Sequence, residues 1–256
     1  MSIGIKIKKG LDINIKGAAA SQDAIVERRS ATAAVCPDDF PGFVPKVEIR
    51  EGDAVKAGAP LLRDKNYPGI KLVSPVSGVV KSVVRGERRK IERVVVETGD
   101  GGPSRLDNGR AAADAAAARE FLQLSGLWAM TRQRPYDIVP LGDAEFRDIF
   151  VSGFDTAPLA VNPAGFTAGD VKALEAGVKL LSLLTSGKVY VSRRQGEMLP
   201  DLAGAEMVDI EGPHPSGNVG TMIAAVKPVN KGETVMCLDL PTLRRVGTAG
   251  LTGIVP

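Results

Sequence analysis

The chain has a single histidine, His214, within the stretch EGPHPSGNVGT that runs from Glu211 to Thr221. A lone histidine without a carboxylate cluster nearby in sequence does not predict a zinc site or a Ser-His-Asp triad. The glycines, prolines and hydroxyl around it favour a rigid loop rich in exposed backbone N–H groups. Such a loop suits either a purely structural turn or a contact with a ligand or partner.

A second group of candidate residues follows the apolar stretch DIFVSGFDT, which predicts a buried strand from Asp148 that ends in a turn at Asp155 and Thr156. Ligands of α/β folds gather at the carboxyl ends of strands, so this turn is a candidate contact site. No G-x-G-x-x-G follows the strand, which argues against a dinucleotide or flavin site. The candidate binding residues are Asp155, Thr156, His214, Pro215, Ser216, Gly217, Gly220 and Thr221.

Composition excludes several classes of protein. The net charge is +3 and aromatic residues make up 4%, so a basic aromatic platform for nucleic acid is not expected. Cys36 and Cys237 form no CxxC pair, which argues against a metal or iron–sulfur site and favours a reducing, cytoplasmic compartment. The first residues alternate apolar with polar, which predicts strands and no signal peptide. No apolar run is long enough to span a bilayer.

Part of the sequence is similar to domains that carry a cofactor covalently bound to a lysine. The stretch IKLVSPVSGVVKSVV, from Ile70 to Val84, resembles the second half of a biotinyl or lipoyl carrier domain. At the position where those domains carry the modified lysine relative to Pro75, this chain has Tyr67. Lys65 comes too early and Lys71 too late, and the inserted residues lengthen the hairpin tip. We therefore expect no covalent cofactor, and we do not expect Lys65 to act as an acceptor.

The remaining pattern predicts a mixed α/β (α+β) protein of two domains. Short strands and regular turns over residues 1–100 predict a barrel-sandwich domain of the biotinyl/lipoyl type. Residues 101–135 are expected to form a linker with a helix over Ala111 to Leu124, capped by Asp107 or Asn108. Residues 136–256 predict a Rossmann-like α/β domain. Its first helix is expected to be capped by Thr167 and to bury Val171, Leu174, Val178 and Leu181.

Four stretches together resemble a known family. KIKKGLDINIKG, DKNYPGIKLVSPVSGVVKSVVRGERRKIERVVVE, IFVSGFDTAPLA and GPHPSGNVGT are similar, in this order, to the A subunit of the sodium-translocating NADH:quinone oxidoreductase (Na+-NQR). The resemblance implies a peripheral, cytoplasmic component of a six-subunit complex at the inner membrane. It implies an oxidoreductase and sodium-transport role for the complex, with the chain itself not catalytic and acting by docking to the other subunits.

The resemblance also carries expectations about cofactors. NADH, FAD, FMN, iron–sulfur centres and Na+ are expected on other subunits, no cofactor is expected on this chain, and ubiquinone is a candidate ligand. Members of the family continue beyond the residue that matches Pro256, so the chain resembles their N-terminal part without the C-terminal domains. The family usually has Gly-Thr-His-Ile-His where this chain has Gly220 to Ala224, with Met222 and Ala224 in place of the histidines.

Two other interpretations of the sequence stay open. One is an electron-transfer protein of the Rnf or complex I type that binds NADH or FMN, which predicts a yellow protein. The other is a carrier module of the biotin or lipoyl type, which predicts a mass adduct. Protein colour and intact mass separate both from the leading hypothesis.

Overall fold

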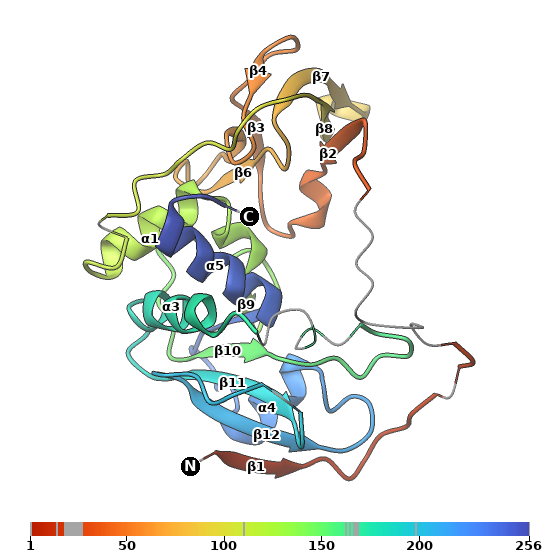
Figure 1. Cartoon of the computed structure of the whole chain (residues 1–256), viewed down its shortest axis with the longest axis vertical. Coiled ribbons are helices and arrows are strands. Elements are labelled where there is room, and N and C mark those ends of the chain that lie inside the picture. Colours follow the sequence, from red (N-terminus) through yellow and green to blue (C-terminus); the bar gives the residue numbers. More distant parts are fainter. Residues whose placement is uncertain are drawn as a thin grey trace. The chain divides into compact units, whose positions relative to one another are not determined.

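The computed structural model describes residues 2–13, 15–17, 28–109, 111–161, 163, 165, 169–197 and 199–255 (Figure 1). The chain divides into two compact units. Met1–Glu27 and Glu145–Gly247 form the first, which we call the α/β unit. Arg28–Ala144 and Thr248–Pro256 form the second, which we call the barrel unit. The predicted mixed α/β fold, with a barrel-sandwich part and a separate α/β part, is confirmed.

The barrel unit contains two antiparallel sheets, ordered β2-β8-β7-β4 and β3-β5-β6. β-Branched residues dominate its two longest strands and fill its core, where Val80 of β7 pairs with Val96 of β8 and both are buried. Leu61, Leu62 and Leu72 of the other sheet are also buried. The strands are β2 (Thr32–Val35), β3 (Pro45–Val47), β4 (Ala54–Val55), β5 (Pro60–Asp64), β6 (Lys71–Val73), β7 (Gly78–Arg85) and β8 (Ile91–Thr98).

The hairpin between β5 and β6 corresponds to the hairpin that bears the modified lysine in carrier domains, and hydrogen bonds to Asp64 fix its conformation. The buried carboxylate of Asp64 accepts the backbone N–H groups of Val44, Asn66 and Tyr67. Burial, and the negative charge of Asp143 beside it, raise the pKa of the Tyr67 hydroxyl. The tip is thus fixed around Asp64, and Lys71 lies within β6, with its Nζ 2.7 Å from Glu48 Oε1.

The connecting helix is α1 (Ala115–Leu124), which lies within the predicted range but starts later. Its N-cap is Asp114, whose side chain accepts the backbone N–H of Ala117 at 2.8 Å. The predicted caps Asp107 and Asn108 are therefore wrong, because Asp107 instead accepts the N–H of Gly109. The remaining elements of the barrel unit are η1 (Pro37–Asp39), η2 (Glu87–Arg89), η3 (Trp128–Met130) and β9 (Arg132–Arg134).

In the α/β unit, parallel strands lie in the order β1-β12-β11-β10-β13. The central strands β10, β11 and β13 are mostly buried, as expected for a parallel sheet covered on both faces, whereas the edge strand β1 has only half-buried and exposed residues. The strands are β1 (Ile3–Lys6), β10 (Ile149–Ser152), β11 (Val189–Arg194), β12 (Glu206–Glu211) and β13 (Val235–Asp239). The helices are α3 (Val171–Ser182), α4 (Val219–Val226) and α5 (Leu240–Thr252), of which α5 belongs to this unit as far as Gly247.

Helix α3 buries three of the four residues whose spacing predicted it, Leu174, Val178 and Leu181, whereas Val171 is half-buried. It begins at Val171 after Asp170, whose carboxylate pairs with Arg244 of α5 at 2.8 Å. The predicted cap Thr167 lies outside the described residues. Among the described residues no helix is both long and apolar enough to cross a bilayer.

The N-terminal strand belongs to a different unit from the one that the sequence predicts. β1 pairs in parallel with β12, with Ile3 opposite Val208, so it is an edge strand of the α/β sheet and not part of a 1–100 domain. Ile3 and Ile5 pack on an apolar cluster that includes Phe150, Met222 and Ile210. The predicted boundaries 101–135 and 136–256 also differ from the structure, which keeps residues up to Ala144 in the barrel unit.

Candidate functional site

The turn after β10 and the His214 loop meet, as the carboxyl-end rule predicts. The hydroxyl oxygen of Thr156 lies 3.0 Å from Nδ1 of His214 and accepts the backbone N–H of Gly217, also at 3.0 Å. Ser152, the last residue of β10, donates from its hydroxyl to the carbonyl of Gly217 at 3.0 Å. Hydrogen bonds from two residues at the end of one strand therefore hold the loop.

These contacts accommodate one neutral form of His214 that bears on binding. Thr156 Oγ1 accepts a hydrogen bond from Gly217 and can donate its own proton to Nδ1 of His214. A neutral imidazole that accepts at Nδ1 carries its proton on Nε2. In that tautomer the half-buried ring carries an N–H donor on its Nε2 side.

The N-terminal segment contributes to the site, which the sequence did not reveal. The backbone N–H of His214 donates to Asp12 Oδ1 at 2.9 Å, and the N–H of Leu11 donates to the His214 carbonyl at 3.0 Å. A Cβ added at Gly10 would lie 2.0 Å from that carbonyl oxygen, so only glycine permits the approach. The alternating pattern of this segment predicted a strand and carried no signal of its partner.

Within the loop, two residues are structural. Ser216 is buried and donates to the carbonyl of Gly212 at 2.8 Å. A Cβ added at Gly217 would lie 2.7 Å from the backbone N of Thr156, so the loop and the strand end touch backbone to backbone. The peptide bond between His214 and Pro215 is cis. The loop therefore places His214 by rigid backbone contacts on both sides.

The other predicted residues lie around this centre. Asp155 is exposed, and its carboxylate accepts the backbone N–H of Ala157 at 2.8 Å. Gly220 and Thr221 lie in the first turn of α4, and Gly220 is exposed with open space beside its Cα. Thr156 and His214 are thus the predicted side chains that contact each other directly, and Asp155 remains open to solvent.

Among the described residues, a backbone donor at the strand end is already used within the protein. The backbone N–H of Gly153 donates to the Ser192 hydroxyl at 3.1 Å and is not available to a phosphate. Among the residues that the structure describes, no group of His, Cys, Asp and Glu is arranged to hold a metal ion.

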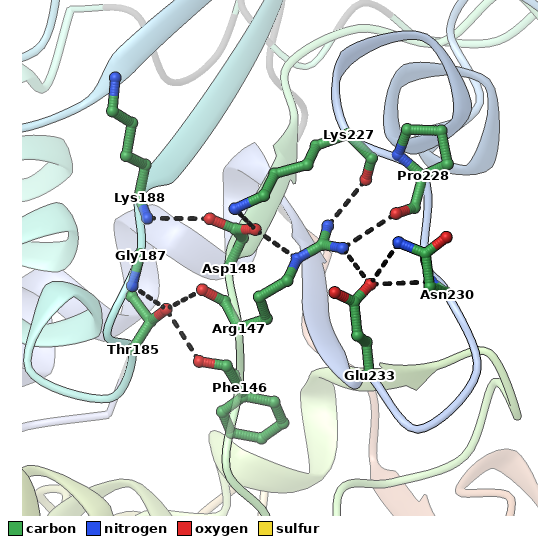
Figure 2. Close-up of polar contacts among 10 residues, drawn as sticks. All are labelled: Phe146, Arg147, Asp148, Thr185, Gly187, Lys188, Lys227, Pro228, Asn230 and Glu233. Atoms are coloured by element: carbon green, nitrogen blue, oxygen red, sulfur yellow. Dashed lines mark hydrogen bonds and ion pairs between the residues drawn. The ribbon is translucent and has the colours of Figure 1, made fainter.

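A second polar cluster lies just before the start of β10, and Figure 2 shows it. The carboxylate of Asp148 is fully buried and pairs with Arg147 at 2.6 Å and with Lys227 at 2.8 Å. The Lys188 backbone N–H also donates to it, at 3.1 Å. The Arg147 guanidinium further pairs with Glu233 and donates to the backbone carbonyls of Lys227 and Pro228.

Burial disfavours a charged Asp148, but the hydrogen bonds from Lys227, the Lys188 backbone and Arg147 outweigh it and lower the pKa of this carboxyl. Hydrogen bonds from Asn230, together with Arg147, likewise lower the pKa of Glu233. The cluster joins three loops at the amino end of the sheet. Nothing in the sequence indicated it, since Asp148 stands in an apolar stretch and its partners are distant in the chain. We assign it a structural role.

Comparison with known proteins identifies both parts of the chain. Residues 5–99 match the family model described as the NqrA N-terminal barrel-sandwich hybrid domain, and residues 113–255 match that of the NqrA second alpha/beta domain. The chain is similar to proteins named as the A subunit of the Na(+)-translocating NADH-quinone reductase. It is 36% identical to the one from Serratia proteamaculans over 97% of this chain and 57% of the relative.

Relatives with the same name give similar values. The protein from Alcanivorax borkumensis is 36% identical over 95% of this chain and 56% of its own length, and that from Vibrio vulnificus is 36% identical over 97% and 57%. The chain therefore spans about half the length of the curated relatives that it matches. Since the two family models together cover nearly all of it, the chain belongs to the NqrA family.

Proposed function

We propose that this chain serves as the NqrA component of a sodium-translocating NADH-quinone reductase, on the cytoplasmic side of the membrane. The observation that carries the proposal is the match of residues 5–99 and 113–255 to the N-terminal and second domains of NqrA. In this role the chain docks onto the other subunits of the complex. The NADH, flavin, iron–sulfur and sodium sites then lie on those subunits, and this chain contributes structure and a binding surface to the enzyme.

The test of docking is a pull-down in detergent, in which no bilayer is present. The remaining subunits, purified through a tag on one of them from a strain without NqrA, are mixed with the chain. We expect the chain to be retained in a 1:1 ratio with the tagged protein, on the simplest stoichiometry. Resin without the complex serves as the control. Retention no higher than on that resin would refute the proposed docking role.

We further propose that the site around Thr156 and His214 contacts a quinone. A quinone carbonyl accepts hydrogen bonds, and a His214 that accepts the Thr156 hydroxyl proton at Nδ1 would have its Nε2–H as a donor. Asp155, Gly220 and Thr221 border the same region, and the loop from Pro215 to Gly217 fixes the imidazole in place. The His214 ring would then position a quinone head group without itself transferring electrons.

Because His214 is the only histidine, its ring nitrogens give unambiguous ¹⁵N NMR signals. Titration with a short-chain ubiquinone should shift the Nε2–H resonance in the wild-type chain. The Lys65→Gln variant, changed at the exposed barrel hairpin, is the matched control and should respond as the wild type does. An Nε2–H signal that does not move at saturating quinone would rule out this contact while leaving the docking role intact.

A further inference from the structure

In the described part of the α/β unit, the large apolar side chains that are exposed lie in two segments. Among the described residues of this unit, the exposed large apolar side chains are Leu11, Ile13, Ile15, Leu159 and Val161, each more than half exposed. The first three lie on residues 8–17, which we call the arm. The other two follow the turn after β10. Elsewhere in the described part of the unit, large apolar side chains are buried or half-buried, so this concentration marks an interaction surface.

The two segments lie together at the carboxyl end of the sheet. A Cβ added at Gly17 of the arm would lie 3.7 Å from a methyl carbon of Leu159. The start of the arm is held by the Leu11 and Asp12 hydrogen bonds to His214, whose loop also contacts Thr156. Figure 1 shows the arm and the stretch after β10 extending to the same side of this unit. Their apolar side chains thus form one surface, which we call the apolar patch.

The arm is also positively charged. Lys8, Lys9 and Lys16 are exposed and flank the apolar side chains, whereas Asp12 is the arm's one acidic residue. The Asp12 carboxylate already accepts the backbone N–H of His214. The apolar patch is therefore bordered by cations that are available to an anionic partner.

We propose that the arm and the apolar patch dock on the surface of an anionic lipid bilayer. The lysines would contact lipid phosphates while the Leu, Ile and Val side chains enter the boundary between headgroups and acyl chains. Exposed apolar side chains alternate here with polar residues, lysines lie toward both ends of the arm, and a fluid interface adapts to such a surface. The arm's backbone groups outside the sheet stay hydrated in the headgroup layer. This contact requires neither the other subunits nor a quinone.

The test is flotation of the purified chain with lipid vesicles. Vesicles with 30% phosphatidylglycerol in phosphatidylcholine should bind the chain at low salt, and pure phosphatidylcholine should bind it much more weakly, on the surface-charge argument. Replacing Lys8, Lys9 and Lys16 together by Gln should weaken binding about a hundredfold, at about fivefold per lysine. Replacing Leu11, Ile13 and Ile15 together by Ser should weaken it at least about tenfold.

Two further measurements sharpen the result. The control variant carries Lys56→Gln, Lys65→Gln and Lys81→Gln, which remove the same charge from exposed positions of the barrel unit. Because these lysines lie outside the arm, the affinity for vesicles should stay within about twofold of the wild type. Tryptophan emission of an Ile13→Trp variant should shift to shorter wavelength with anionic vesicles, since Trp128 is already buried and supplies a constant background.

The proposal fails if the chain does not prefer anionic vesicles. It also fails if both arm variants bind like the wild type, or if the control loses as much binding as the arm lysine variant. Failure here, combined with retention in the detergent pull-down, would assign the apolar patch to a protein partner. The substituted arm residues are exposed, and an unchanged thermal unfolding curve would confirm that each variant is folded.

Discussion

The Thr156 hydroxyl lies 3.0 Å from Nδ1 of His214. The same oxygen accepts the Gly217 N–H, so one side chain from the strand end connects both ends of the loop around the cis proline. The contact joins a fixed secondary structure element to the only imidazole of the chain. It is the point at which the candidate site can be tested most directly.

A Thr156→Val variant keeps the shape of the side chain and removes its hydroxyl. We expect unfolding to become easier by about 1–3 kcal/mol, because the Gly217 N–H and His214 Nδ1 lose their partner in a half-buried site. The ¹⁵N spectrum of His214 should change from one dominated by the Nε2–H tautomer to a mixture. Thr156→Ser retains the hydroxyl and should keep the wild-type tautomer. A spectrum unchanged in Thr156→Val would contradict the assignment.

Two glycines near the site form a matched pair. In Gly217→Ala the new Cβ would lie 2.7 Å from the Thr156 backbone N, so the loop must move away from β10. We expect a loss of about 1–3 kcal/mol, as for other overpacked sites. Gly220→Ala points into open space on α4 and should be neutral or stabilising by up to about 1 kcal/mol. Urea denaturation of both variants measures the difference, and equal stabilities would show that the close contact is absent.

The buried carboxylate of Asp148 should make stability depend on pH. In Asp148→Asn the charges of Arg147 and Lys227 lose their shared partner, and we expect about 3 kcal/mol of destabilisation at pH 7. Because the pKa of Asp148 is lowered in the folded state, its contribution is fully present above the unfolded value, near 4 in model peptides. The contribution is lost as the pH falls from there through the folded pKa.

The free energy of unfolding of wild type and Asp148→Asn should therefore differ by a constant amount above about pH 5 and converge in more acid solution. Taking the difference between the two proteins cancels most of the titration of Glu233, whose pKa is also lowered and whose partner is Arg147. The exposed Asp155→Asn serves as the control and should not show this convergence. A difference that grows toward acid pH would have the wrong sign for a lowered pKa.

Position 222 tests the departure from the family's usual sequence. Met222 is 1% exposed and packs in the apolar cluster around Phe150 and Tyr190, whose rings stack at 5.0 Å. Met222→His would bury a polar ring there and should cost about 2 kcal/mol. Ala224→His lies on the exposed side of α4 and should be nearly neutral. Similar melting temperatures for the two variants would mean that Met222 is not part of the core.

Expression in a host with biotin and lipoate ligases should give an unmodified chain. Lys65 is exposed but lies in a tip that Asp64 fixes through the backbone of Asn66 and Tyr67, a shape unlike a two-residue carrier turn. Intact-mass measurement decides the matter, with a biotin-accepting domain in the same cells as a positive control. A biotinyl or lipoyl adduct on Lys65 would establish a carrier function.

The sequence predicted those parts of the fold that local chemistry determines. Regular turn residues indicated the barrel strands, and the spacing of Leu174, Val178 and Leu181 indicated α3. The partner of β1 could not be predicted, because a period-two pattern specifies a face and not a neighbouring strand. The helix cap Asp114 was missed since several polar residues precede α1 and only the fold selects one.

The candidate site, too, could be predicted from the sequence only in part. The meeting of Thr156 with the His214 loop follows from the rule that ligand loops gather at the carboxyl ends of parallel strands. Asp12 and Gly10 could not be found, because their contact with His214 depends on the placement of β1. The Asp148 cluster could not be predicted for a related reason, since its partners Lys188 and Lys227 are distant from it in the sequence.

The pairing of β1 with β12 sets an order of events during synthesis. Ile3 and Ile5 are made before the barrel strands, but their partners Val208 and Ile210 are made only after both barrel sheets are complete. The nascent chain therefore carries this apolar strand without its native partner while the barrel is synthesised. Such a segment is open to chaperones or to wrong pairing until β12 has been made. Lys6 at the end of the strand and Lys8 just after it help to keep the segment soluble in the meantime.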